Sequence, residues 1–219
     1  MKVKLISYSQ SPVNQEHNNQ TLQDLVAYCA RVSNPANQSN TETNEKLIKY
    51  LIYNKHWSPL EMVNICIEVE TTRDIARQIL RHRSFSFQEF SQRYSVATLG
   101  FENKEARLQD TKNRQNSIEI DDKTLSDEWM KRQDEIAKYS SESYKWAIEN
   151  NIAKEQARAV LPEGMTISRM YINGTLRSWV HYIQLRSGNG TQKEHREVAL
   201  ACSNCISEIF PIIKDLIIE

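Results

Sequence analysis

Glycine is scarce in this chain of 219 residues, which contains only five. The dinucleotide-binding motif G-x-G-x-x-G could begin at Gly188 and Gly190, but it would need a third glycine at position 193, which is a lysine. A Walker A sequence is absent as well. The sequence therefore excludes both of the common glycine-rich loops that bind phosphate groups.

An excess of charge of one sign and a long apolar run are also missing. The 28 Lys and Arg residues balance 28 Asp and Glu residues, and the mean hydropathy is −0.63. Proteins that hold nucleic acid mainly through counterion release are usually basic, and a membrane-spanning helix needs about 20 apolar residues. Residues 1–8 are followed by polar residues, unlike a secretory signal. We therefore expect a cytoplasmic protein, in a bacterium or in the host of a bacteriophage, with neither a nucleic-acid polymer nor a membrane as its partner.

Cysteine is too sparse for a disulfide framework in a chain of this size without a secretory signal, since only four are present. Cys202 and Cys205 have the spacing of a zinc-ligand pair, but no second pair accompanies them. They lie in an apolar helical run, where free cysteines behave as small hydrophobes. A core-facing pair is the favoured interpretation, a metal or redox site is the alternative, and we predict no metal.

The spacing of apolar residues predicts few strands and several helices. Val63, Ile65, Ile67 and Val69 alternate with polar residues, which is typical of a strand. This pattern predicts an α+β fold with a small antiparallel sheet and long helices, in a single domain over 1–219. The expected strands are 1–8, 63–69 and 168–172, the expected helices are 21–32, 45–55, 73–83, 125–149, a shorter one up to 160, 175–185 and one after 190, residues 97–123 are expected to be irregular, and Gly174 is expected in a turn.

The densest chemical signal lies in residues 73–93, which hold five of the 14 arginines and no lysine. Phe85, Phe87 and Phe90 interleave with the polar residues there. A solvated helix face would need neither feature. Because the guanidinium fork suits phosphate and planar carboxylate groups, we expect an anion-binding site.

Four separated motifs point in the same direction. Residues 81–83 read RHR, and after seven residues Ser91 opens the sequence SQRYS. Upstream, 56–61 reads HWSPLE; downstream, 157–162 reads ARAVLP and 173–186 reads NGTLRSWVHYIQLR. Their types and order resemble the flavin-dependent thymidylate synthases, which make dTMP from dUMP with FAD, methylenetetrahydrofolate and NADPH. The resemblance covers about residues 28 to 200 and implies the fold of that family.

The resemblance implies a dUMP site in which Ser91 and Arg93 bind the phosphate and the sugar. Glu89 would face the ribose hydroxyl or a neighbouring arginine, and Arg158 would be a second phosphate ligand. Without the resemblance, Arg158 reads as a solvated arginine on a short helix. The implied dUMP-binding residues are Gln78, Ile79, Leu80, Arg81, Glu89, Phe90, Ser91, Gln92, Arg93, Arg158 and Arg186.

The same resemblance implies a tightly bound FAD. Arg177 and His181 are four residues apart on one helix face, although His181 could instead be a core histidine beside Trp179 and Tyr182. His56 would lie near the substrate-binding face, or else be a turn histidine. The implied FAD-binding residues are Ser58, Glu61, Arg81, His82, Arg83, Glu89, Thr175, Leu176, Arg177 and His181.

Arg186 is the implied catalytic residue. It would lie against the uracil ring and stabilise negative charge at N3 and O4. Because the pKa of arginine exceeds ~12, this contribution is electrostatic and not that of a base. No cysteine falls in the arginine cluster, so attack by a thiolate, as in the classical thymidylate synthases, is not expected. Without the resemblance, Arg186 reads as an arginine favoured by a helix C-terminus.

Family members are homotetramers whose sites combine residues from several subunits, and the resemblance implies the same here. Two alternatives remain open from the sequence. A colourless RNA- or nucleotide-binding module would use the arginines and phenylalanines to grip phosphates and stack bases. An inactive relative would keep the flavin but would not consume NADPH in a dUMP-dependent way.

Overall fold

The computed structural model describes residues 1–11 and 21–216, in which short strands alternate with helices of very different length. The strands are β1 (Lys2–Tyr8), β2 (Asn64–Thr72), β3 (Ser86–Glu89), β4 (Arg107–Gln109), β5 (Ser117–Glu119) and β6 (Ile167–Thr175). The α-helices are α1 (Leu22–Ala30), α2 (Asn44–Tyr53), α3 (Arg73–Ile79), α4 (Lys123–Glu149), α5 (Lys154–Ala157), α6 (Leu176–Arg186) and α7 (Lys193–Ser207). Short 3-10 helices are η1 (Pro35–Asn37), η2 (Ser58–Glu61), η3 (Arg158–Val160) and η4 (Pro211–Leu216).

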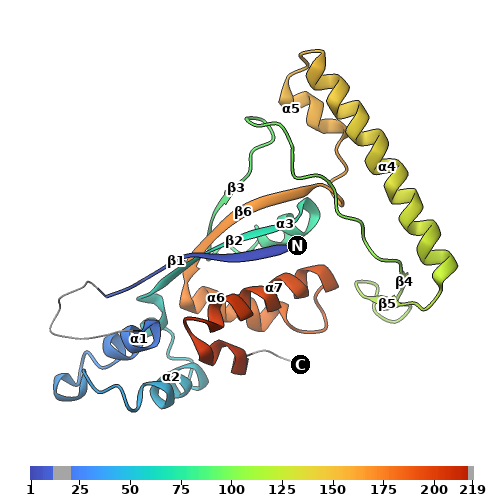
Figure 1. The fold of residues 1–219 in the computed structure, drawn as a ribbon. Helices are drawn as coiled ribbons and strands as arrows, with labels where there is room; N and C mark the ends of the chain where they lie inside the picture. The colour runs from blue at the N-terminus through green and yellow to red at the C-terminus, as the bar shows by residue number, and fades with distance from the viewer. Residues whose placement is uncertain (12–20, 217–219) are drawn as a thin grey trace.

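The main sheet has the order β1-β2-β6-β3, and each neighbouring pair is antiparallel. Its central pair, β2 and β6, is in register from Asn64 opposite Thr175 to Thr72 opposite Ile167. Helices α6 and α7 pack against one face of this sheet (Figure 1). A separate hairpin is formed by β4 and β5.

The core lies between the sheet and these helices. Ile65 and Ile67 of β2 are fully buried, and the indole N–H of Trp179 donates a hydrogen bond of 3.0 Å to the carbonyl of Ile65. That bond satisfies the polar edge of a fully buried ring, as a stable core requires. The core continues through Met170, Ile172, Leu176, Val180, Ile183, Val198, Ala199, Cys202 and Ile206.

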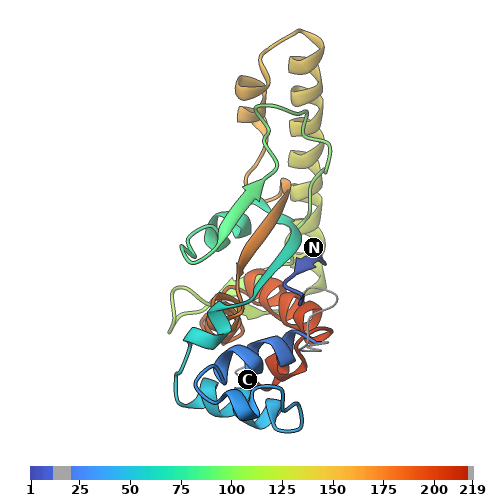
Figure 2. The same cartoon turned by 90° about the vertical axis from the view of Figure 1, so that its left-hand side faces the viewer.

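Helix α4 projects as an arm away from the sheet and carries α5 at its far end (Figures 1 and 2). Only a small cluster, Tyr144, Ala147 and Ala157, is buried where α4 meets α5. None of the helices in residues 1–11 and 21–216 combines the length and the apolar character needed to cross a membrane.

The expected α+β fold with a small antiparallel sheet is confirmed, but three local expectations are wrong. The helix expected over 73–83 ends at Ile79, and β3 follows it at the sheet edge because β6 offers it a pairing partner that the local sequence does not reveal. Residues 97–123 contain the hairpin β4–β5. Gly174 lies inside β6, opposite Ile65, and not in a turn.

Gly174 is required by a close approach of the Phe85 ring. A Cβ atom at this position would lie 2.3 Å from Cδ1 and 2.7 Å from Cε1 of Phe85. Phe85 is itself buried, and its ring centroid is 4.7 Å from that of Trp179, so the ring has little room to move. A glycine inside a strand is typical of such contacts.

We predict that Gly174→Ala lowers the free energy of unfolding by about 1–3 kcal/mol, the usual cost of overpacking a core. Gly164→Ala is the matched control, because a Cβ there meets no atom within 4 Å. Urea denaturation of both variants measures the difference. Equal stability of the two variants would show that Phe85 adapts freely.

Candidate functional site

Arg186 and His82 meet where the chain leaves α3 and where α6 ends. The Nε of Arg186 donates a hydrogen bond of 3.0 Å to Nε2 of His82. Burial, followed by the charge of Arg186, lowers the pKa of His82 to about 4, so the ring is neutral at pH 7 and accepts this bond. Within the described residues, the terminal nitrogens of Arg186 make no hydrogen bond. The guanidinium is thus held by one edge while its other edge remains available.

Gln78, at the end of α3, joins this group through two residues that sequence reasoning missed. Its Nε2 donates to Oε1 of Gln192 at 2.7 Å, and its Oε1 lies 3.2 Å from Nδ1 of His195. His195 is fully buried, and burial, followed by the charges of Arg186 and His82, lowers its pKa to about 3. No motif marks Gln192 or His195 in the sequence. Their only signal is their spacing of three residues, which places Gln192 at the N-cap of α7 and His195 in its first turn, on the same side.

Arg81 and Arg83 flank His82 and differ from it in exposure. Both arginines are exposed, whereas His82 is half-buried. Neither arginine has an acidic partner in the part of the chain that the structure describes. The RHR motif therefore turns two uncompensated guanidinium groups toward solvent and one imidazole toward the core.

A second group of candidate residues lies where α6 faces η2. Arg177 forms an ion pair with Glu61, and the His181 ring meets the Trp57 ring edge-on at a centroid distance of 4.5 Å. Burial, followed by the charge of Arg177, lowers the pKa of His181. Ser58 is exposed at the start of η2. The structure thus brings Ser58, Glu61, Arg177 and His181 to one surface.

Glu89 ends β3 and is surrounded by donors. Its Oε1 accepts from Oγ of Ser168 at 2.9 Å and from Nη1 of Arg73 at 3.4 Å. Nη1 of Arg77 lies 3.9 Å from Oε2. Of the two partners expected for Glu89, the neighbouring arginine is therefore present, and Arg73 and Ser168 are further residues that the sequence did not single out.

The candidate phosphate ligands form a third group, at the tip of the arm. Arg93 and Arg158 both contact Glu155: Nε of Arg93 is 3.5 Å from its carboxylate, and Nε of Arg158 donates to its carbonyl at 3.3 Å. Lys154 fixes the loop after exposed Ser91 by donating to the carbonyl of Tyr94 at 3.0 Å. Both views place α5 far from α6, the helix that ends at Arg186 (Figures 1 and 2). One chain does not bring the two groups together.

Several candidate side chains are occupied by the fold itself. Ile79 and Leu176 are fully buried in the core, so only their backbone could meet a ligand. Thr175 caps α6 by accepting from the backbone N–H of Ser178. Gln92 is also buried, Leu80 packs against the core, and the N–H of Phe90 donates to the carbonyl of Arg169.

The side chains of Cys202 and Cys205, the two cysteines with the spacing of a zinc-ligand pair, differ in burial. Cys202 is fully buried in the core, as expected, and burial raises its pKa; Cys205 is half-buried. Within residues 1–11 and 21–216, no group of three or more His, Cys, Asp or Glu side chains could hold a metal ion.

Comparison with known proteins gives a consistent result. Residues 16–212 match the family described as "Thymidylate synthase complementing protein". The chain is 47% identical over 216 residues to a probable flavin-dependent thymidylate synthase of Paramecium bursaria Chlorella virus 1, and 46% identical over 213 residues to the flavin-dependent thymidylate synthase of Synechocystis sp., with 97% of each chain covered in both cases.

Among solved structures, the fold resembles that of a UMP/dUMP methylase, PolB from Streptomyces cacaoi, bound with 5-Br dUMP. The TM-score is 0.81 at 24% identity, and the match covers 98% of this chain and 93% of that chain. At this identity, the likeness supports the fold alone. With the family match and the two relatives, the conclusion is that the chain belongs to the flavin-dependent thymidylate synthase family.

Proposed function

We propose that this protein methylates dUMP reductively to dTMP, with methylenetetrahydrofolate as the carbon donor and FAD reduced by NADPH as the hydride source. The observation that carries this proposal is the Arg186 guanidinium, held at Nε by a neutral His82 and open at its other edge. Membership of the flavin-dependent thymidylate synthase family supports the reaction class.

The chain's own residues fit FAD. Arg81 and Arg83 are exposed, and among the described residues they have no acidic partner, which suits the diphosphate of a dinucleotide. Arg177 and His181 add a cation and a ring on the surface that Ser58 and Glu61 share. When bound and reduced, the flavin supplies the hydride, and the protein supplies position and charge.

Arg186 acts on the substrate through its charge. We propose that it lies against the uracil and stabilises negative charge at N3 and O4. It has no carboxylate partner in the described residues, and the neighbouring imidazole of His82 is uncharged, so its charge is neither neutralised nor opposed. A fixed charge of this kind needs no rearrangement as the reaction proceeds. Gln78, Ser91, Arg93 and Arg158 hold the nucleotide.

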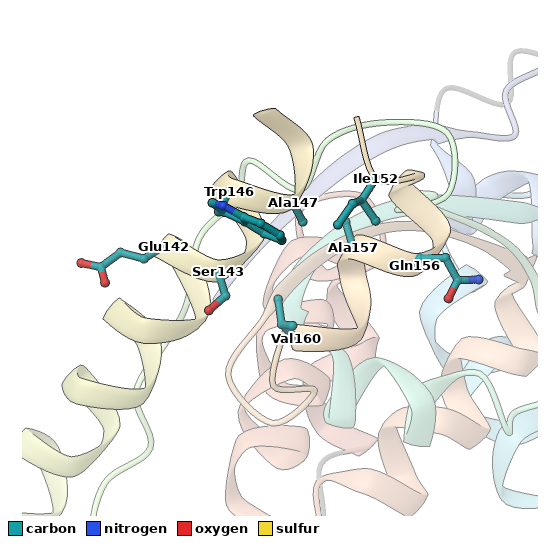
Figure 3. A pocket seen from close by; sticks show the side chains of 8 residues that line it. All are labelled: Glu142, Ser143, Trp146, Ala147, Ile152, Gln156, Ala157 and Val160. Carbon is teal, nitrogen blue, oxygen red and sulfur yellow. The ribbon is translucent and has the colours of Figure 1, made fainter. Parts of the chain in front are cut away.

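A homotetramer completes the site. Trp146 is 60% exposed and borders an apolar groove between α4 and the segment formed by α5 and η3. Figure 3 shows Trp146 on one side of this groove, and Ala157 and Val160 on the other. Large exposed apolar side chains on a helix are typical of interfaces. We propose that the arm packs against other copies of the chain, which brings Arg93 and Arg158 of one subunit to Arg186 of another.

We also propose a single domain over 1–219 in the cytoplasm, with small molecules and not nucleic-acid polymers as ligands. One large core supports the first proposal, because it joins β1, β2 and β6 to α1, α2, α3, α6 and α7. All four cysteines are free, which suits a reducing compartment.

We predict that the purified protein supplied with FAD shows a flavin absorption band that shifts with dUMP and bleaches with NADPH without oxygen. A flavin that binds while NADPH consumption stays independent of dUMP would instead indicate an inactive relative. If no flavin binds, the proposal fails, and polynucleotide binding at several salt concentrations is tested next.

Arg186→Ala is predicted to lower kcat/KM for dTMP formation by roughly 100- to 1,000-fold, the loss typical of one preorganised donor, while FAD stays bound. Arg114→Ala is the control, since it removes an exposed guanidinium from the loop between β4 and β5. Activity of Arg186→Ala close to that of the control would remove Arg186 from the catalytic role.

Sedimentation is predicted to show a tetramer that Trp146→Glu dissociates into smaller species, because a charge in the groove opposes apolar packing. Lys145→Glu introduces the same residue one position earlier, where the side chain is exposed and does not line the groove. A monomeric wild-type protein would contradict the proposal.

A further inference from the structure

A continuous network of one ion pair and several hydrogen bonds connects the hairpin β4–β5 to Gln78. Arg107 of β4 forms an ion pair with Glu194, whose Oε2 accepts from Nε2 of Gln192 at 2.9 Å. Oε1 of Gln192 accepts from Nε2 of Gln78 at 2.7 Å. Oε1 of Gln78 then lies 3.2 Å from Nδ1 of His195. Gln78 is thus held at both ends of its amide by the first turn of α7 and the residue before it.

The chemistry of these groups determines which group donates and which accepts in each hydrogen bond of this network. Burial raises the pKa of Glu194, but its own backbone N–H, Gln192 and the charges of Arg107 and Lys104 outweigh that effect and lower it overall. An ionised carboxylate only accepts hydrogen bonds. Gln192 must therefore turn its NH2 group toward Glu194 and its oxygen toward Gln78.

The same reasoning determines the donor and acceptor roles of the two ring nitrogens of His195. Because Gln78 gives its NH2 group to Gln192, its oxygen faces His195, which must donate through Nδ1. A neutral imidazole has one donor and one acceptor. Its Nε2 is accordingly unprotonated, and this atom is buried with no partner in the described residues.

We propose that Gln192 and His195 form an amide clamp that fixes the orientation of Gln78 for dUMP, and that both are positioning residues. An amide without such partners can rotate by 180° with almost no change in shape, exchanging donor for acceptor. The clamp removes that freedom before the substrate arrives, which lowers the cost of ordering on binding. This inference rests on the proposed role of Gln78 as a dUMP ligand.

Ion pairs from the hairpin β4–β5 and from the residue Glu105 before it hold the start of α7, next to the clamp residues. Besides the ion pair of Arg107 with Glu194, Lys193 forms ion pairs with Glu105 at 2.8 Å and with Glu119 of β5. These contacts surround the start of α7, directly beside Gln192 and His195. The hairpin β4–β5, a polar segment without a recognisable motif, therefore contributes to the positioning of the substrate.

The test compares His195→Leu with His195→Asn in the FAD-loaded protein. The two side chains have similar shapes, but only the asparagine offers a donor near the place of Nδ1. Gln192→Met is the third variant, because Gln192 is exposed and its loss leaves the core intact. The dissociation constant of dUMP, read from the flavin spectrum, KM and kcat are measured together with FAD content.

His195→Leu and Gln192→Met are expected to weaken dUMP binding by about 3- to 10-fold, the range of one hydrogen bond. FAD content should be unchanged, and His195→Asn should recover most of the affinity. In a Gln78→Leu background, the same substitutions should have no further effect, since the amide to be positioned is gone.

Wild-type affinity in both His195→Leu and Gln192→Met would overturn the clamp, as would equal losses in His195→Asn and His195→Leu, which would assign His195 a packing role only. Gln192→Met decides the question alone if the His195 variants do not fold. Failure of the proposed function is distinguishable, because the wild-type protein would then show no spectral response to dUMP.

Discussion

The antiparallel register of β2 with β6 is the constraint on which the site depends. Thr72 at the end of β2 lies opposite Ile167, and Asn64 lies opposite Thr175 at the end of β6, so α3 and α6 start from opposite ends of the same strand pair. Strands of 9 residues span about 30 Å, and helices of 7 and 11 residues span about 10 and 16 Å. When both helices fold back over the sheet, their C-terminal ends meet, which places Arg186 at His82.

At that meeting point, burial controls which groups are charged. His82 and His195 lie with ring centroids 6.3 Å apart and both have strongly lowered pKa values, caused first by burial and then by Arg186. The only cation of this group is therefore Arg186, within the described residues. An uncharged surrounding strengthens a fixed charge, because fewer solvent dipoles screen it. The hydrogen bonds of both imidazoles then follow from their single remaining proton.

The sequence alone predicts what depends on neighbours along the chain. The alternation in Ile65, Ile67 and Val69 predicts β2, which the structure forms over Asn64–Thr72. What depends on distant partners is not predictable in this way. β3 forms because β6 offers it an edge, and Gly174 is required by Phe85, 89 positions earlier.

The same distinction between local signals and distant partners applies to the residues of the candidate site. The resemblance of the motifs to a known family points to Arg81, His82, Arg93 and Arg186, whereas residue type alone marks only the arginine cluster of 73–93. Gln192 and His195 contact Gln78 across 114 and 117 positions and carry no motif. Burial likewise separates Ile79 and Leu176 from their exposed neighbours only once the fold is known.

Two parts of the proposed site lie apart within one chain, Arg186 on the body and Arg158 on the arm. The most direct measurement is dTMP formation by a co-expressed mixture of Arg186→Ala and Arg158→Ala subunits, with dUMP, FAD, NADPH and methylenetetrahydrofolate. If sites join the body of one chain to the arm of another, some sites contain both native arginines, and the mixture regains activity that neither variant has alone. A mixture as inactive as the separate variants, beside an active wild-type protein, would contradict this account.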